Sequence, residues 1–296
     1  MRIFVTGATG FVGSAIVPEL LGAGHRVLAL SRSDEGARSL LAAGAEVHRG
    51  DLEDLESLRS GADVSDGIIH VGFNHDFSRF AENSETDRRA IEMMGSVLEG
   101  SNRPLIVTSG VPLTPHHLTT EDDVPPPGSG GTPRVSEQTA IALVARGVRA
   151  LVVRMSQVHD RDKQGLATYL IALAREKGIS AYVGAGINRW PAVHRFDAAT
   201  IYRLVLEKGL TGARYHAVAE EGVSVREIAE AIGRGLKIPV VALSPDEAKN
   251  HFGWLAFPVS MDAPVSSTLT QQRLGWHPTE KPGFIADLER SSAFEA

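Results

Sequence analysis

Short apolar runs alternate with helical patterns along the first half of the chain. Apolar residues recur at helical spacing over 11–23, 82–99 and 134–146, and Thr132 and Pro133 suit the start of the last of these helices. The strand-like runs, rich in β-branched residues, lie at 2–6, 26–31, 45–50, 67–72, 104–110 and 149–155. Because strands that alternate with helices pair in parallel, and continuous apolar runs suit strands buried on both faces, the pattern predicts a doubly wound parallel α/β sheet.

Helical patterns dominate the second half of the chain. They cover 166–177, 197–208, 224–236 and 282–290, and short strands are expected at 214–218 and 239–243. We therefore predict a smaller C-terminal α+β substrate domain, partly interleaved with the first. The predicted division is 1–157 and 158–296, with segments near 195–218 returning to the first domain.

The segment 119–133, TTEDDVPPPGSGGTP, separates the fifth and sixth predicted strands. Its prolines and glycines exclude a regular helix or strand. It follows the carboxyl end of a strand, where open parallel sheets bind their ligands. The segment is therefore either a disordered surface loop or a loop that closes over a ligand.

A glycine-rich loop, GATGFVG, follows the first predicted strand and opens the first helix. Gly7 permits the sharp turn, Gly10 lets the backbone approach a pyrophosphate, and Gly13 lets the helix pack close to the strand. Amide N–H groups and the dipole at the start of a helix favour phosphate. This order of strand, loop and helix indicates dinucleotide binding rather than a simple turn.

The composition of the 296-residue chain narrows the remaining classes. The net charge is −6, and without a basic run or a basic–aromatic stripe we expect no nucleic-acid partner. The chain has no cysteine, which excludes disulfides and thiolate metal sites, and we expect no metal. No apolar run reaches about 18 residues, and the loop at Gly7 comes too early for a signal peptide. We therefore expect a soluble, cytoplasmic protein without a membrane partner.

The Gly-x-x-Gly-x-x-Gly spacing, the length and the layout resemble the short-chain dehydrogenase/reductase family, in its extended or atypical branch. GDLED (50–54), IIHVGF (68–73), AVHRFDAA (192–199) and RLGWHP (273–278) resemble further landmarks of that branch, in the same order. The resemblance implies a Rossmann-like fold, a nicotinamide cofactor and a small-molecule substrate. The implied cofactor contacts are Gly7, Thr9, Gly10, Phe11, Val12, Gly13, Asp51, Leu52, Val71, Gly72 and Ser109.

The end of the second predicted strand, ALSRS, bears on which nicotinamide cofactor binds. NAD enzymes usually place Asp or Glu there for the ribose 2′-hydroxyl, and this strand has neither. Arg32 offers a guanidinium for a 2′-phosphate, and Ser31 and Ser33 offer hydroxyl donors. Asp34 and Glu35 would repel that phosphate unless they start the next helix, where acids suit the dipole. We predict NADP(H), the alternative being that Arg32 is an ordinary surface residue.

The resemblance implies catalysis by Ser, Tyr and Lys, and the chain departs from this pattern. Ser109, after the fifth predicted strand, matches the serine. The stretch GGTPRVSEQTAIAL, where Tyr and Lys are expected, contains neither. One alignment puts Pro133 at the tyrosine position and Glu137 at the lysine position, and a shifted register puts Arg134 and Gln138 there. In both alignments the usual proton donor is missing.

Three explanations for the missing pair stay open. The first is a reductase with a substitute acid, because histidine titrates near neutrality and Arg134 can orient a carboxylate or polarise a carbonyl. The second is hydride transfer to an iminium or activated alkene, which needs little protein acid. The third is a non-catalytic NADP(H) sensor. Candidate donors are His75, Asp76, His159, Tyr182 and His194, and the predicted catalytic residues are Ser109, Arg134, His75 and His159.

Aromatic and polar side chains in the later segments are candidates to line the substrate pocket. We predict substrate contacts from Phe73, Tyr182, Trp190, His194 and Trp254, the alternative for the aromatic residues being packing within the second domain. An aromatic pocket favours a hydrophobic carbonyl over a sugar nucleotide.

Two predicted helices carry apolar stripes that either face the sheet or form a homodimer, as the corresponding helices of the family often do. The stripes are Ile91, Met94 and Leu98 on the first helix and Ile141, Val144 and Ala145 on the second.

The features together predict an NADP(H)-dependent oxidoreductase for a small carbonyl- or imine-type substrate. The alternatives are an epimerase- or dehydratase-like enzyme and a non-catalytic NADP(H)-binding protein.

Overall fold

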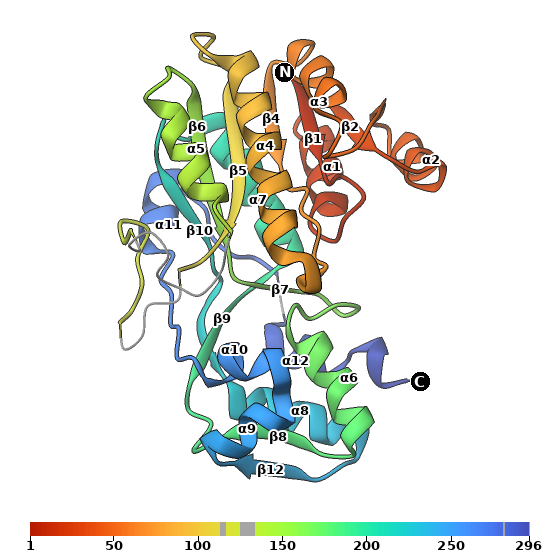
Figure 1. The fold of residues 1–296 in the computed structure, drawn as a ribbon, viewed down its shortest axis with the longest axis vertical. Helices are drawn as coiled ribbons and strands as arrows, with labels where there is room; N and C mark the ends of the chain where they lie inside the picture. The colour runs from red at the N-terminus through yellow and green to blue at the C-terminus, as the bar shows by residue number, and fades with distance from the viewer. Residues whose placement is uncertain (113–116, 125–133, 281, 296) are drawn as a thin grey trace.

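The structure is a computed structural model that describes residues 1–112, 117–124, 134–280 and 282–295. Its main sheet has seven strands in the order β10-β6-β5-β4-β1-β2-β3, all paired in parallel (Figure 1). The strands are β1 (Arg2–Thr6), β2 (Arg26–Ser31), β3 (Glu46–Arg49), β4 (Gly67–His70), β5 (Pro104–Gly110), β6 (Arg149–Met155) and β10 (Arg214–Ala217). The predicted doubly wound parallel sheet is therefore confirmed.

Helices cover both faces of this sheet. One face packs against α1, α2 and α7, and the other against α3, α4 and α5. Their bounds are α1 (Gly13–Gly22), α2 (Asp34–Ala42), α3 (Leu55–Asp63), α4 (Phe80–Leu98), α5 (Ser136–Val144) and α7 (Arg195–Lys208), with a 3-10 turn, η1 (Phe77–Arg79), before α4. The strand order reverses between β1 and β4, and such a reversal is where open α/β sheets bind ligands.

The apolar stripe predicted on α4 faces the sheet. Ile91, Met94 and Leu98 are fully buried in the core between α4 and the strands. Their burial corrects the idea that this stripe forms a dimer surface, and a homodimer stays a prediction without that support. Helix α5 begins at Ser136, whereas Thr132 and Pro133 lie outside the described residues.

A second unit with its own apolar core lies below the main sheet in Figure 1. It contains a three-stranded sheet, β11-β9-β7, and a two-stranded sheet, β12-β8. Its strands are β7 (Gln157–His159), β8 (Ser180–Val183), β9 (Arg189–His194), β11 (Glu220–Ser224) and β12 (Val240–Leu243). Its helices are α6 (Ala167–Lys177), α8 (Val225–Leu236), α9 (Pro245–Phe252), α10 (Ala256–Ser260) and α12 (Phe284–Glu289), with 3-10 turns η2 (Gly253–Leu255) and η3 (Ser292–Phe294).

The chain crosses between the two units several times. Helix α7 follows β9 directly and packs on α1, and β10 then joins the main sheet beside β6. Helix α11 (Thr268–Leu274) returns to α7, where the buried Trp276 donates its indole N–H to the Asp197 carbonyl at 3.1 Å. The edges of both units therefore meet near the carboxyl ends of the main strands. Within the described residues, no helix is long and apolar enough to cross a membrane.

Candidate functional site

The glycine loop between β1 and α1 packs directly on the turn after β4. Gly7 has a φ of 67°, and a Cβ there would lie 2.6 Å from the Gly72 nitrogen. A Cβ on Gly13 would lie 2.1 Å from the Gly7 carbonyl oxygen. Larger residues at these positions would separate the strand from the helix, so the loop requires glycine.

The start of α1 presents N–H groups to the outside of this loop. In the described part of the chain, the amides of Phe11, Val12 and Gly13 donate no hydrogen bond. The helix has no side-chain cap and no acidic residue in its first turn. A Cβ on Gly10 would meet only the Gly7 carbonyl oxygen, at 3.1 Å, so the backbone is open to a ligand. These features fit the diphosphate of a dinucleotide.

The carboxyl ends of β2 and β3 form the region predicted to hold the adenosine part of the cofactor. Arg32 is exposed, with Nη1 4.0 Å from Asp51. Arg49 donates hydrogen bonds to the Ser33 carbonyl at 2.5 Å and to the Asp34 carboxylate at 2.8 Å. We expected the charge of Asp34 to oppose a 2′-phosphate unless Asp34 started a helix. Asp34 is the first residue of α2, and its charge is paired with Arg49.

The two serines beside Arg32 are partly engaged already. The buried Ser31 donates its hydroxyl to the Ser33 carbonyl at 3.1 Å, and the Ser33 hydroxyl caps α2 by accepting from Gly36 N–H. A Cβ on Gly72 would lie 3.1 Å from a methyl carbon of Leu52, so Leu52 covers the turn that also contains Val71. Ser33 keeps its hydroxyl proton for a ligand, whereas Ser31 does not.

A buried chain of hydrogen bonds connects the glycine loop to α5. Gly72 N–H donates to Thr6 Oγ1, which pairs with His70 Nδ1 at 2.7 Å. His70 Nε2 lies 2.9 Å from Asp87 Oδ1, and Ser136 donates its hydroxyl to Asp87 Oδ2. Since Thr6 accepts from Gly72, the network is satisfied with Thr6 donating to Nδ1 and Nε2 donating to the carboxylate.

We did not predict this series of hydrogen bonds from the sequence, although the sequence contains an indication of it. Asp87 continues the apolar stripe of α4, because 87, 91, 94 and 98 share one helix face. A carboxylate on a face that packs against a sheet requires buried partners. Burial raises the pKa of Asp87, but the hydrogen bonds from His70 and Ser136, with the charge of Arg134, outweigh it and hold that pKa below its usual value.

Arg134 lies at the end of this series of hydrogen bonds. Its Nε donates to Ser136 Oγ at 2.8 Å, and its Nη2 donates to the Thr108 carbonyl at 2.9 Å. The guanidinium carbon lies 4.3 Å from the centroid of the Phe73 ring. Burial lowers the pKa of Arg134, but a guanidinium still keeps its charge at neutral pH. The structure therefore fixes a cation between the carboxyl ends of β4 and β5.

His75 lies near this cation, and Ser109 lies next to Thr108 at the end of β5. The ring of His75 contacts the edge of Phe73, with 5.3 Å between centroids. Loss of water around the ring and the positive charge of Arg134 lower the pKa of His75 below 6.5. Ser109, the penultimate residue of β5, is partly exposed, and its hydroxyl makes no hydrogen bond among the residues that the structure describes. Two predicted residues, Arg134 and His75, thus lie against the Phe73 ring, and Ser109 follows Thr108, whose carbonyl Arg134 binds.

The side chain of Glu137, which one alignment puts at the lysine position, points toward β6 and β10. Its carboxylate accepts two hydrogen bonds from Arg154 of β6, both 2.7 Å, and one from Arg214 of β10. Arg154 is fully buried. Pro133, at the tyrosine position of the same alignment, lies outside the described residues. Tyr202 is also fully buried, and its hydroxyl forms a hydrogen bond with the Thr108 hydroxyl. Burial raises the pKa of Tyr202, so this residue does not replace the missing acid.

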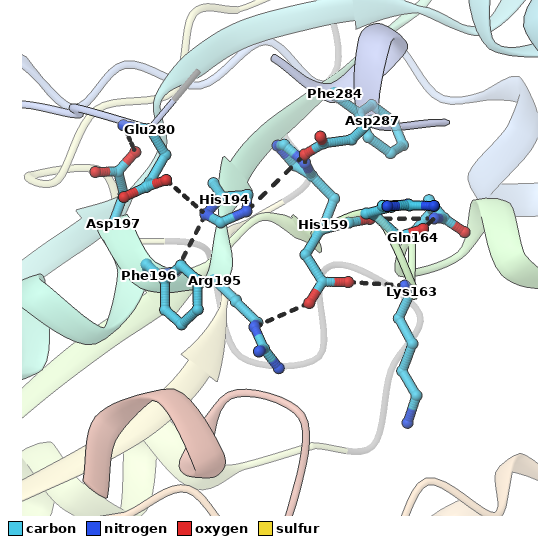
Figure 2. A network of polar contacts seen from close by, with 12 residues as sticks. His159, Lys163, Gln164, His194, Arg195, Phe196, Asp197, Glu280, Phe284 and Asp287 are labelled. Carbon is cyan, nitrogen blue, oxygen red and sulfur yellow. Dashed lines mark hydrogen bonds and ion pairs between the residues drawn. The ribbon is translucent and has the colours of Figure 1, made fainter. Parts of the chain in front are cut away.

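His159 and His194 belong to a separate polar cluster between the two units (Figure 2). His159 Nδ1 lies 2.8 Å from Asp287 Oδ2, and His194 Nε2 lies 4.0 Å from the same oxygen. Burial lowers the pKa of His159, which is 1% exposed. That burial corrects the prediction of a proton donor open to substrate at His159. No three His, Cys, Asp or Glu side chains among the described residues are arranged to hold a metal ion.

The predicted substrate residues of the second unit do not converge. Trp190 is 4% exposed and donates its indole N–H to the Pro258 carbonyl, which favours the packing interpretation. Tyr182 lies on β8, where the Arg226 guanidinium carbon is 5.7 Å from the centroid of its ring, and its contact with a substrate stays a prediction. Trp254 is half-exposed on η2 and contacts the ring of Tyr169. Of the other predicted substrate residues, His194 lies in the polar cluster of Figure 2, and Phe73 lies against Arg134.

Comparisons with known proteins agree with this geometry. A family model described as the NAD dependent epimerase/dehydratase family matches residues 3–218. The Uncharacterized protein C2A9.02 of Schizosaccharomyces pombe is 48% identical, over 99% of this chain and 100% of that protein. The sterol-4-alpha-carboxylate 3-dehydrogenase, decarboxylating, of Dictyostelium discoideum is 26% identical, over 76% of this chain and 74% of its own.

A solved structure supports the fold alone. The UDP-glucose 4-epimerase of Thermotoga maritima, solved with UDP-glucose, superposes with a TM-score of 0.75 at 18% identity. The superposition covers 100% of this chain and 98% of the other. The Rossmann-like sheet with a smaller C-terminal unit is therefore shared across that distance.

Proposed function

Because the chain belongs to the NAD-dependent epimerase/dehydratase family, the extended branch of the short-chain dehydrogenases/reductases, we propose that it is an NADP(H)-dependent oxidoreductase. Its substrate is a small carbonyl- or imine-type compound. The relative from Dictyostelium discoideum is named a dehydrogenase, which supports a redox role. The cofactor, when bound, supplies the hydride donor or acceptor, and the chain's own side chains orient the substrate and handle the proton.

The observation that carries the proposal is the fixed guanidinium of Arg134. It lies in the segment where the family carries its Tyr and Lys, held by Ser136 and the Thr108 carbonyl over the ring of Phe73. A buried cation stabilises negative charge that develops on a carbonyl oxygen, and a guanidinium does so without losing its own proton. Ser109 provides a neighbouring hydroxyl donor for the same oxygen.

His75 is the proposed group for the proton. Its lowered pKa keeps the ring mostly neutral at pH 7. A neutral ring accepts the proton of an alcohol that is being oxidised, and the same nitrogen returns it in the reductive direction. This arrangement replaces the usual Tyr and Lys by a cation that polarises the substrate and a histidine that exchanges the proton.

Arg32 and Arg49 support NADP(H) over NAD(H). Arg32 projects from the tip of β2 near Asp51, and Arg49 pairs with Asp34, so the negative charge of Asp34 is neutralised beside the proposed 2′-phosphate position. The test is calorimetric titration with NADPH and NADH. We expect Arg32→Ala to weaken NADPH about tenfold and to leave NADH unchanged. Arg38→Ala, an exposed arginine of α2, is the matched control. Equal NADPH affinity in both variants would remove the assignment.

Turnover tests the reaction itself. Substrate-dependent oxidation of NADPH is measured with panels of aldehydes, ketones and imines. We expect a substrate whose turnover falls at least a hundredfold in Arg134→Gln and about tenfold in Ser109→Ala. Interconversion of isomers or loss of water without net NADPH oxidation would instead indicate an epimerase- or dehydratase-like enzyme.

A second candidate function is a non-catalytic NADP(H)-binding protein. The observation that favours it is Glu137, which occupies the lysine position of one alignment and is bound by Arg154 rather than left open to a cofactor ribose. Tight NADPH binding without turnover of any compound in the panels would support this function over the oxidoreductase.

A further inference from the structure

Two cations, one from the loop between β7 and α6 and one from the start of α7, face the glycine loop. Lys163 Nζ lies 5.8 Å and the Arg195 guanidinium carbon 5.4 Å from the centroid of the Phe11 ring. Both distances are within the range of a cation–π contact. Phe11 stands between Gly10 and Val12, at the point where the loop opens its amides to a ligand.

Arg195 is held in this position by one carboxylate. It is the first residue of α7, and its Nε forms an ion pair with Asp160 Oδ2 at 2.9 Å. Among the residues that the structure describes, its guanidinium completes no hydrogen bond. In Figure 2 the end of this side chain points away from the histidine cluster, toward the side where the red N-terminal segment passes.

Lys163 projects from a turn whose backbone is fixed. Asp160 Oδ1 accepts from the amides of Asp162 at 2.7 Å and Lys163 at 2.9 Å. The fully buried Gln164 donates to the carbonyls of Asp160 and Arg161. The Lys163 side chain is exposed and has no ion pair or hydrogen bond in the described ranges, and in Figure 2 it leaves the cluster in the same direction as Arg195.

The arrangement brings two positive charges to one ring, and among the described residues Asp160 is the acidic side chain that forms an ion pair with one of them. Like charges that approach each other cost free energy unless an anion lies near both. The glycine loop supplies unpaired N–H donors on the other side of that space. A ligand with two adjacent negative charges satisfies the amides and both cations together.

We propose that Lys163 and Arg195 bind the diphosphate of the dinucleotide held by the glycine loop. The inference rests on the cofactor binding of the proposed function but not on its redox chemistry. Arg195 offers forked N–H donors to phosphate oxygens, and Lys163 acts as a point charge. Because Lys163 comes from the second unit and Arg195 from the start of α7, the bound diphosphate joins both segments to the β1–α1 loop.

The test separates the diphosphate from the rest of the cofactor. ADP-ribose carries the diphosphate without the nicotinamide or 2′-phosphate, and 2′,5′-ADP carries two phosphates that are not linked to each other. Dissociation constants for both are measured by calorimetry in Lys163→Gln, Arg195→Gln and wild type. We expect each variant to bind ADP-ribose five- to tenfold more weakly than the wild type and 2′,5′-ADP less than twofold more weakly. The affinity for ADP-ribose is also expected to depend less on salt concentration in each variant than in the wild type.

Arg161→Gln is the matched control, because Arg161 is an exposed arginine in the same turn as Lys163. We expect this variant to bind ADP-ribose as the wild type does. Equal weakening in Arg161→Gln and Lys163→Gln would show only a long-range charge effect and would overturn the proposal. Unchanged ADP-ribose affinity in both Lys163→Gln and Arg195→Gln would also overturn it.

Two further outcomes keep the proposal distinct from the proposed function. If wild-type protein binds ADP-ribose and the two variants do not differ from it, only the present inference fails. If wild-type protein binds neither ADP-ribose nor NADPH, the cofactor assignment fails together with it. Thermal unfolding of the ligand-free proteins checks the fold, and Lys163→Gln, which changes an exposed side chain, is expected to melt as the wild type does.

Discussion

Glu137 and Arg154 form a doubly hydrogen-bonded ion pair inside the protein, with both N–O distances at 2.7 Å. Burial raises the pKa of Glu137, but the hydrogen bonds and charges of Arg154 and Arg214 outweigh it, and the pKa lies below the usual 4.5. A carboxyl with a lowered folded-state pKa stabilises the fold fully above its unfolded-state pKa. That stabilisation is lost as the pH falls through the folded-state pKa.

Glu137→Gln is therefore expected to destabilise the protein by about 3–5 kcal/mol at pH 7, because it leaves Arg154 buried without a counter-charge. Urea unfolding measures the loss. The difference between wild type and variant is expected to shrink below pH 4.5, as the wild-type carboxyl becomes protonated. Glu92→Gln removes an exposed ion pair with Arg88 and is expected to cost less than about 1 kcal/mol. A difference that stays constant down to pH 3 would contradict this account.

Asp87→Asn tests the buried series of hydrogen bonds that ends at Arg134. Asp87 accepts from both His70 and Ser136, and an amide can accept only on one of its two atoms. We expect a loss of about 2–3 kcal/mol in urea unfolding. Glu85→Gln, one exposed position on the same helix, is the control and is expected to change stability by less than about 0.5 kcal/mol. Similar effects of the two substitutions would exclude a buried role for Asp87.

The pKa of His75 reports on Arg134. Burial first, and then the positive charge of Arg134, lower this pKa below 6.5. Arg134→Gln removes the charge, so the His75 pKa is expected to rise, and NMR titration of the imidazole protons measures it without an activity assay. Activity that needs the neutral ring is expected to fall as the pH drops through this pKa, at a higher pH in the variant. Arg79→Gln, an exposed arginine of η1, should leave the titration unchanged.

The two ends of α1 provide a matched pair of glycine substitutions. A Cβ on Gly13 would lie 2.1 Å from the Gly7 carbonyl oxygen, whereas a Cβ on Gly22 meets no atom within 4 Å. Gly13→Ala is expected to destabilise the protein by about 1–3 kcal/mol and to weaken dinucleotide binding. Gly22→Ala is expected to be neutral or to stabilise by up to about 1 kcal/mol, since alanine favours helix. Thermal unfolding and calorimetry of both variants decide whether close packing at Gly13 matters.

The parts of the fold that local sequence determines were predictable. Gly7 and Gly13 follow a β-branched strand and open a helix, so their role depends on neighbours in the chain, and the structure places them as expected. Most strands of the main sheet were found for the same reason, because they are largely apolar runs, although β3 (EVHR) and β10 (RYHA) carry charged and polar residues. The predicted parallel sheet therefore follows from patterns that extend over only a few residues.

Features that depend on distant partners were not predictable in the same way. Trp190 looks like a ligand contact in its own segment, and only the Pro258 carbonyl, far along the chain, shows that its indole is satisfied within the core. Thr6, His70 and Ser136 are unremarkable residues until the fold brings them to Asp87. A polar residue on an apolar helix face was the one local indication of that network.

The Glu137–Arg154 pair also constrains how this protein can change. Glu137→Lys alone would place a third cation beside Arg154 and Arg214, two groups that Glu137 now neutralises. Introduction of the lysine that one alignment expects at this position therefore demands compensating substitutions on β6 and β10 at the same time. Laboratory selection for stable variants with lysine at position 137 should therefore yield them only from libraries that vary positions 137, 154 and 214 together.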